Sequence, residues 1–257
     1  MADSNETAYE FNEVTWWSNW TETRWLSRNA YLLFSKDFDE YFFNRGGFLK
    51  ITADSSKSVA PMEVEFEARK RKPHLLLQSD QLDPKLLVTL AKGGYRIADQ
   101  MAVMEIDEPS FKVNPDLKIE HVTGSKLEAW ARVYLDSFYG DSGQLKTVME
   151  IVQKLAKVKE ASLLLGTIEG QPAGVTALFR SGKVCGAYCV ATHRDWRRKR
   201  VASSMLEFSH RLAVGEGRTL VLQTILSESL EGLYLKLGFR RAYLKDLFVK
   251  DAGRVLK

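Results

Sequence analysis

The stretch VATHRDWRRKRVASSML, residues 190–206, decides how the rest of the sequence is interpreted. It begins as an apolar strand, passes through a turn, and continues as a helix whose start lies under clustered basic residues. The first backbone N–H groups of a helix have no intrahelical partner and carry a partial positive charge, so they bind anions. We therefore predict a diphosphate-binding turn between a strand over 183–192 and a helix over 197–214.

A second pattern follows at residues 220–240. An apolar strand, LVLQ at 220–223, precedes a predicted helix over 227–237, and Gly238-Phe239 then opens a further strand. Tyr234 is the one tyrosine of that helix. A phenol has a pKa near ~10 and stays protonated at neutral pH, so Tyr234 has a proton that it can donate.

Together the two patterns resemble motifs A and B of the GNAT acetyltransferase superfamily. Motif A reads (Arg or Gln)-x-x-Gly-x-(Gly or Ala), and Arg197 and Ala202 match it, but Arg200 stands at the glycine. We expect Arg200 to have ordinary helical angles, which would keep its N–H in place with the side chain turned outward.

The resemblance implies an acetyl-CoA-dependent N-acetyltransferase. In the family, the strand before motif A pairs with the pantetheine arm, the matching N–H of Val190 polarises the thioester carbonyl, and the tyrosine that matches Tyr234 protonates the leaving thiolate. Ser227 lies where the family often has an asparagine that contacts pantetheine. The implied cofactor-binding residues are Val190, Thr192, Arg197, Arg198, Lys199, Arg200, Val201, Ala202, Ser203 and Ser227.

The chain also contains an internal repeat. HLLLQ at 74–78 with GGYR at 93–96 resembles LVLQ at 220–223 with GFR at 238–240, and each pair brackets a predicted helix. Leu90 stands where the second copy has Tyr234, and the first copy has no arginine-rich turn. We therefore predict two tandem GNAT-like domains, a degenerate one over 1–114 and a complete one over 115–257.

The predicted fold class is α/β with a mixed sheet. The second copy has the order β-α-α-β-β-β-α-β-α-β-β, which is that of the GNAT fold. Its other elements are strands over 117–122, 161–168, 173–179 and 220–224, helices over 125–138 and 145–158, and final strands over 239–249.

Composition excludes several classes of protein. The chain has 257 residues, 45% of them apolar, and a net charge of +4, which gives little support to nucleic-acid binding. No apolar run approaches the ~20 residues needed to cross a bilayer, and the Cys185–Cys189 spacing predicts neither a disulfide nor a metal site. We expect a cytoplasmic monomer or homodimer without a metal.

The acceptor and the general base are left open by the sequence. The resemblance implies a small-molecule or peptide amine acceptor, and candidates for the base are Tyr188, Asp136, Asp141 and His193. Cys189 has no recognisable histidine-carboxylate partner to make it a nucleophile. Two alternatives are a non-catalytic acyl-CoA-binding or interaction module and a tandem-fold aminoacyl transferase.

Overall fold

The computed structural model describes residues 5–140 and 143–250, which form two compact units. The first unit comprises residues up to Val103, Gln223–Glu231 and residues from Arg241 onward, and the second comprises Met104–Leu222 and Gly232–Arg240. These units do not coincide with the two sequence copies, because the C-terminal segment contributes to both. The copy boundary between residues 114 and 115 stays a prediction. No described helix is long and apolar enough to cross a membrane.

The first unit is a mixed sheet with helices on both faces. Its strands follow the order β1-β2-β3-β4-β11, in which only β3 and β4 pair in parallel. Its elements along the chain are α1 (Asn5–Trp17), β1 (Glu22–Trp25), β2 (Ala30–Phe34), β3 (Arg45–Phe48), α2 (Val59–Ala68), β4 (His74–Gln78), α3 (Pro84–Lys92) and most of β5 (Tyr95–Ile106).

Strand β2 shows why helices cover both faces of this sheet. Its sequence, AYLLF, is apolar throughout and every residue is buried. Successive side chains of a strand point to opposite faces. Accordingly Leu32 packs in the cluster that contains Met62 of α2, while Leu33 packs with Val14 of α1. The unit therefore has an apolar layer on each side of its sheet.

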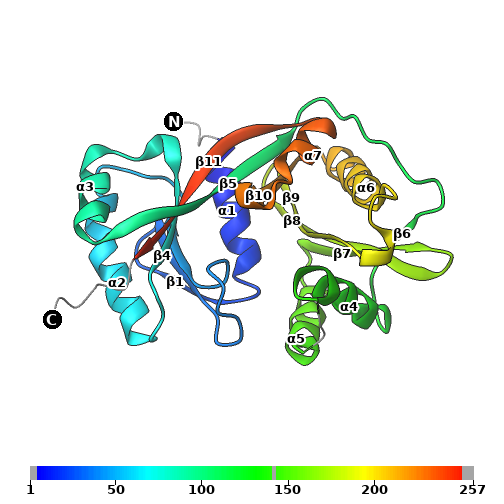
Figure 1. Cartoon of the computed structure of the whole chain (residues 1–257), viewed down its shortest axis with the longest axis horizontal. Helices are drawn as coiled ribbons and strands as arrows, with labels where there is room; N and C mark the ends of the chain where they lie inside the picture. The colour runs from blue at the N-terminus through cyan, green and yellow to red at the C-terminus, as the bar shows by residue number, and fades with distance from the viewer. Residues whose placement is uncertain (1–4, 141–142, 251–257) are drawn as a thin grey trace. The chain divides into compact units, whose positions relative to one another are not determined.

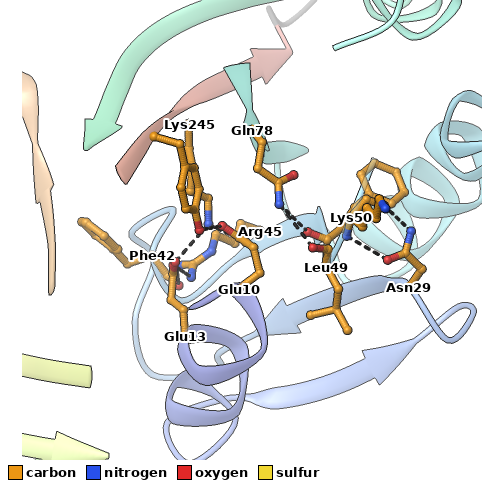
Figure 2. Close-up of polar contacts among 11 residues, drawn as sticks. Glu10, Glu13, Asn29, Phe42, Arg45, Leu49, Lys50, Gln78 and Lys245 are labelled. Atoms are coloured by element: carbon orange, nitrogen blue, oxygen red, sulfur yellow. Dashed lines mark hydrogen bonds and ion pairs between the residues drawn. The ribbon is translucent and has the colours of Figure 1, made fainter. Parts of the chain in front are cut away.

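A buried network of charges joins α1 to the sheet (Figure 2). Lys245 Nζ of β11 (Phe239–Lys250) lies 2.8 Å from Glu10 Oε2 and 3.0 Å from Glu13 Oε2, and Arg45 Nη2 lies 2.5 Å from Glu13 Oε1. All four side chains are at most 2% exposed. Burial opposes ionisation, yet the charges of Lys245 and Arg45 lower the pKa of Glu13. Two cations thus neutralise two carboxylates inside the unit.

The second unit is a three-layer arrangement. Helices α4 and α5 cover one face of its strands and α6 covers the other (Figure 1). The strand order is β10-β9-β8-β7-β6, with only β9 and β10 in parallel. The elements are β6 (Lys118–His121), α4 (Lys126–Phe138), α5 (Leu145–Leu155), β7 (Ala161–Ile168), β8 (Gln171–Ser181), β9 (Val184–Thr192), α6 (Val201–Gly215), β10 (Thr219–Ile225) and α7 (Glu231–Lys236).

The predicted element order is confirmed, with three corrections at element ends. The helix expected from residue 197 begins at Val201, because two residues before it have left-handed backbone angles. Ser227 lies in a 3₁₀ turn, Leu226–Glu228, and the following helix begins only at Glu231. The final strands expected over 239–249 are one continuous strand, β11.

The internal repeat is present in the element order. Strand, helix and strand recur as β4-α3-β5 and as β10-α7-β11. Gly94 and Gly238 precede the last strand of each set with φ of 77° and 92°. At Gly238, an added Cβ would lie 1.8 Å from the Glu108 carbonyl oxygen, so close backbone approach requires glycine there.

We predict that Lys245→Met destabilises the protein by about 3 to 5 kcal/mol, because it leaves Glu10 buried without a cation and leaves Glu13 with Arg45 alone. Lys250→Met is the matched control on the same strand, since Lys250 is 34% exposed and forms one ion pair with Glu63. It should cost less than about 1 kcal/mol. Urea denaturation of both variants measures the difference, and equal losses would contradict the importance of the buried network.

Candidate functional site

The strand that enters the predicted diphosphate turn is bulged. Between the pairs Val175–Ala191 and Ala177–Tyr188, β8 has one residue and β9 has two. Cys189, within this bulge, has a φ of 52°. A bulge redirects the backbone of its strand and interrupts the regular ladder. Val190 and Thr192, both half-buried, therefore follow a local change in strand direction.

The turn after β9 contains two left-handed arginines. Arg198 has a φ of 62°, and Arg200 has a φ of 60° and a ψ of 20°. The expectation that Arg200 has ordinary helical angles is therefore wrong. For residues other than glycine this conformation costs roughly 1–2 kcal/mol, because Cβ approaches a carbonyl oxygen. Residue 200 thus has the backbone conformation that glycine, the residue of the motif, adopts without this cost, although the residue here is arginine.

These angles bring backbone N–H groups together at the start of α6. A left-handed residue followed by a right-handed one turns successive N–H groups toward a common point, and Arg200 followed by helical Val201 has that alternation. The first intrahelical bond of α6 runs from Ser204 N–H to the Arg200 carbonyl at 3.0 Å. The N–H groups of residues 201–203 lie before that bond and have no intrahelical acceptor. The backbone at this helix start therefore has N–H groups available to a ligand, and their role in holding a diphosphate stays a prediction.

Basic side chains surround this helix start. Arg197, Arg198 and Arg200 are exposed, and none has an ion-pair partner among residues 5–140 and 143–250. Lys199 Nζ lies 4.3 Å from the centre of the Trp196 ring. Three guanidinium groups within four turn positions are thus available to an anion.

Val201 and Ala202 fix the start of α6 against the sheet. Val201 is 1% exposed, and an added Cβ at Gly174 of β8 would lie 2.5 Å from Val201 Cγ1. Ala202 is half-buried. The helix start therefore sits closely on β8 because Gly174 has no side chain, a requirement that the sequence analysis did not identify.

The two serines that were predicted to bind the cofactor form hydrogen bonds within the protein. The Ser203 hydroxyl accepts a hydrogen bond from Lys112 N–H at 3.2 Å, so its side chain faces that segment. The Ser227 hydroxyl donates to Asp99 Oδ2 at 2.5 Å. Ser227 belongs to the first unit, whereas residues 190–203 belong to the second. The role of each serine toward a cofactor stays a prediction.

Tyr234 is buried in the second unit. The residue is 7% exposed on α7, and its ring packs edge-on against Phe239 with centres 6.0 Å apart. The corresponding Leu90 of the first copy is 1% exposed and belongs to an apolar cluster. Core packing accounts for both positions, and only Tyr234 adds a hydroxyl group.

Two candidates for the general base, Asp136 and His193, lie together. His193 Nε2 is 3.8 Å from Asp136 Oδ2, and Arg194 donates a hydrogen bond to Asp136 Oδ1. Burial alone would raise the pKa of Asp136, but the hydrogen bond and the charge of Arg194 lower it. These side chains line a pocket of about 540 Å³ with residues such as Trp196.

The other candidates are constrained differently. Tyr188 is 4% exposed on β9. Asp141 lies outside the described residues. Burial raises the pKa of the Cys189 thiol far above its usual range and that of Cys185 to about 11. Both cysteines are free. Because their pKa values are raised, neither is a reactive thiolate.

In the first copy, side-chain hydrogen bonds occupy the end of β3, the strand that corresponds to β9. Strands β3 and β4 pair at Gly46–Leu75, and the Gln78 side chain then donates to the carbonyls of Leu49 at 3.3 Å and Phe48 at 3.5 Å (Figure 2). Gln78 is 1% exposed. Its amide therefore takes backbone acceptors at the end of β3 that an extended ligand would otherwise use.

Comparisons with known proteins bear on the fold of the chain. The profile of the acetyltransferase (GNAT) domain matches residues 159–241. A GCN5-related N-acetyltransferase from Kribbella flavida is 14% identical, with a TM-score of 0.68 over 97% of each chain. One from Sphaerobacter thermophilus is 15% identical, with a TM-score of 0.67 over 91% of this chain and 83% of that one.

A tandem arrangement also has a structural parallel. A tandem GNAT protein from the clavulanic acid biosynthesis pathway is 12% identical, with a TM-score of 0.56 over 80% of this chain and 74% of that one. No curated protein matches the chain in sequence. The chain has the GNAT fold, and its C-terminal half carries a domain of the GNAT acetyltransferase family.

We predict that Arg200→Gly raises the free energy of unfolding by up to about 1 kcal/mol, because relief of the left-handed strain exceeds the added entropy of the unfolded chain. Arg197→Gly is the matched control, since Arg197 has an extended φ of −62° and ψ of 149°. Arg197→Gly should lower the free energy of unfolding by about 0.5 to 1 kcal/mol. Urea denaturation compares them, and a loss at position 200 as large as at position 197 would count against strain at Arg200.

Proposed function

We propose that the protein is an acetyl-CoA-dependent N-acetyltransferase that acts through its C-terminal copy. One observation carries the proposal: inside the region that matches the GNAT domain, a bulged strand leads to a turn with left-handed and then helical backbone, flanked by three exposed arginines. That turn has N–H donors and positive charge for a diphosphate. GNAT proteins typically use acyl-CoA, so the ligand and the family agree.

The residues present suit this cofactor. The N–H groups of residues 201–203 and the side chains of Arg197, Arg198 and Arg200 would hold the pyrophosphate. The backbone at Val190 and Thr192 would align the pantetheine arm, with the Val190 N–H near the carbonyl that must be polarised. When bound, acetyl-CoA supplies an acetyl group activated as a thioester.

The protonation states of the chain's own side chains favour direct transfer of the acetyl group from the thioester to the amine. An acyl-enzyme route needs a thiolate, and burial keeps Cys189 protonated. Asp136 is a weak base because its pKa is lowered. Tyr234 would give its proton to the departing thiolate. The acceptor would be a small-molecule or peptide amine.

We predict that acetyl-CoA binds with one site per chain, because Gln78 occupies the strand end in the first copy. Isothermal titration calorimetry should give a stoichiometry near one. Saturating acetyl-CoA should also raise the melting temperature, since it binds only the folded chain. Absence of both heat and thermal shift would overturn the cofactor assignment, and two equivalent sites would overturn the closed first copy.

We predict that Tyr234→Phe lowers kcat by ~100- to 10,000-fold while acetyl-CoA affinity stays unchanged, because only the proton-donating hydroxyl is removed. Release of free thiol across a panel of amines measures the rate. Tyr243→Phe is the matched control, since its buried hydroxyl donates to Glu10 at 2.8 Å. That change should lower stability and leave turnover intact. Tight binding without any accepted amine would favour a non-catalytic acyl-CoA binder.

A further inference from the structure

The turn between β9 and α6 must be held in place by its surroundings. Arg198 and Arg200 both have the left-handed conformation that favours glycine. Residues in such conformations persist only where neighbouring groups determine them. Two side chains from elsewhere in the second unit, Asp136 and Asn114, make the contacts that could do this.

Asp136 fixes the beginning of the turn from helix α4. Its Oδ1 accepts a hydrogen bond from Arg194, and His193 Nε2 lies 3.8 Å from its Oδ2. His193 is also fixed by its backbone, since its N–H donates to the Ala173 carbonyl at 2.9 Å. The Asp136 side chain is only 16% exposed, which strengthens its interaction with the Arg194 guanidinium. One carboxylate is thus hydrogen-bonded to Arg194 and lies close to His193, the residue before it in the turn.

Asn114 fixes the end of the turn from the segment that precedes β6. Its Nδ2 donates to the Lys199 carbonyl at 2.9 Å, directly before Arg200. Its Oδ1 accepts from Asp116 N–H at 2.9 Å, which fixes the orientation of the amide. Its own N–H donates to the Ser204 hydroxyl at 2.8 Å. Asn114 therefore joins the last turn residues to the first turn of α6.

We propose that Asp136 and Asn114 are positioning residues that preset the phosphate-binding turn before the cofactor arrives. The identity of the ligand as acetyl-CoA rests on the proposed function, whereas the clamping of residues 193–200 does not. A turn held in its binding conformation does not have to be ordered on binding, and this increases affinity. Neither side chain needs to contact the cofactor for this effect.

Asp136→Asn separates positioning from simple electrostatics. Removal of a negative charge beside a basic turn should strengthen anion binding if charge alone matters. If Asp136 positions the turn, the same change should weaken acetyl-CoA binding about five- to thirtyfold. Glu128→Gln is the matched control, because Glu128 lies on the same helix and pairs only with exposed Arg132. The affinity of Glu128→Gln for acetyl-CoA should equal that of the wild type.

Hydrogen exchange tests the clamp without any ligand. In the ligand-free full-length chain, the turn amides that have backbone acceptors, those of Trp196, Arg197 and Lys199, should exchange at least about tenfold faster in Asp136→Asn and in Asn114→Ala than in the wild type or Glu128→Gln. Arg194→Ala added to Asp136→Asn should change little further, since both remove the same contact. At saturating acetyl-CoA, kcat should be retained while KM rises.

The outcomes distinguish this inference from the proposed function. Unchanged exchange in both variants, or Asp136→Asn binding at least as tightly as the wild type, would overturn the positioning role. If wild-type protein does not bind acetyl-CoA, the proposed function fails, and the exchange rates still decide whether Asp136 and Asn114 hold the turn.

Discussion

The parallel pairing of β9 with β10 is the constraint on which the second unit depends. Parallel neighbours cannot be joined by a tight hairpin, so the chain must leave the end of β9, cross one face of the sheet and return. Helix α6 makes that crossing, which places its first turn just beyond the end of β9. The N–H groups of the helix start therefore lie next to the bulged strand, and these are the two parts of the chain that we propose hold the cofactor.

The two copies show how one element order can give an open or a closed strand end. Both contain a parallel pair, β3 with β4 and β9 with β10. In the first copy, the buried Gln78 amide satisfies carbonyls at the end of β3, and the unit is stabilised by the ion network around Lys245. In the second copy, the strand is bulged and the following turn carries exposed arginines. The difference lies in side chains at strand ends and not in topology.

Strain and its compensation are concentrated at the phosphate turn. Two left-handed arginines cost conformational energy that a glycine would avoid, but each retains a cation close to the helix start. Bonds from Asp136 and Asn114, and the close packing of Val201 on Gly174, hold the turn from three directions. The conformation of the turn is therefore supported by residues that stand far from motif A in the sequence.

The sequence by itself determined the order of elements, the repeat and the place of the helix start, because hydrophobic periodicity and glycine positions are local properties. It also indicated which copy keeps Tyr234 and the arginines. Only the tertiary structure decided the conformation of Arg200, since nothing local distinguishes a helical arginine from a left-handed one. The bulge at Cys189, the closure by Gln78 and the approach of Asp136 to Arg194 likewise depend on partners distant in sequence. Such contacts form only when the strands and helices pack, so no local pattern records them.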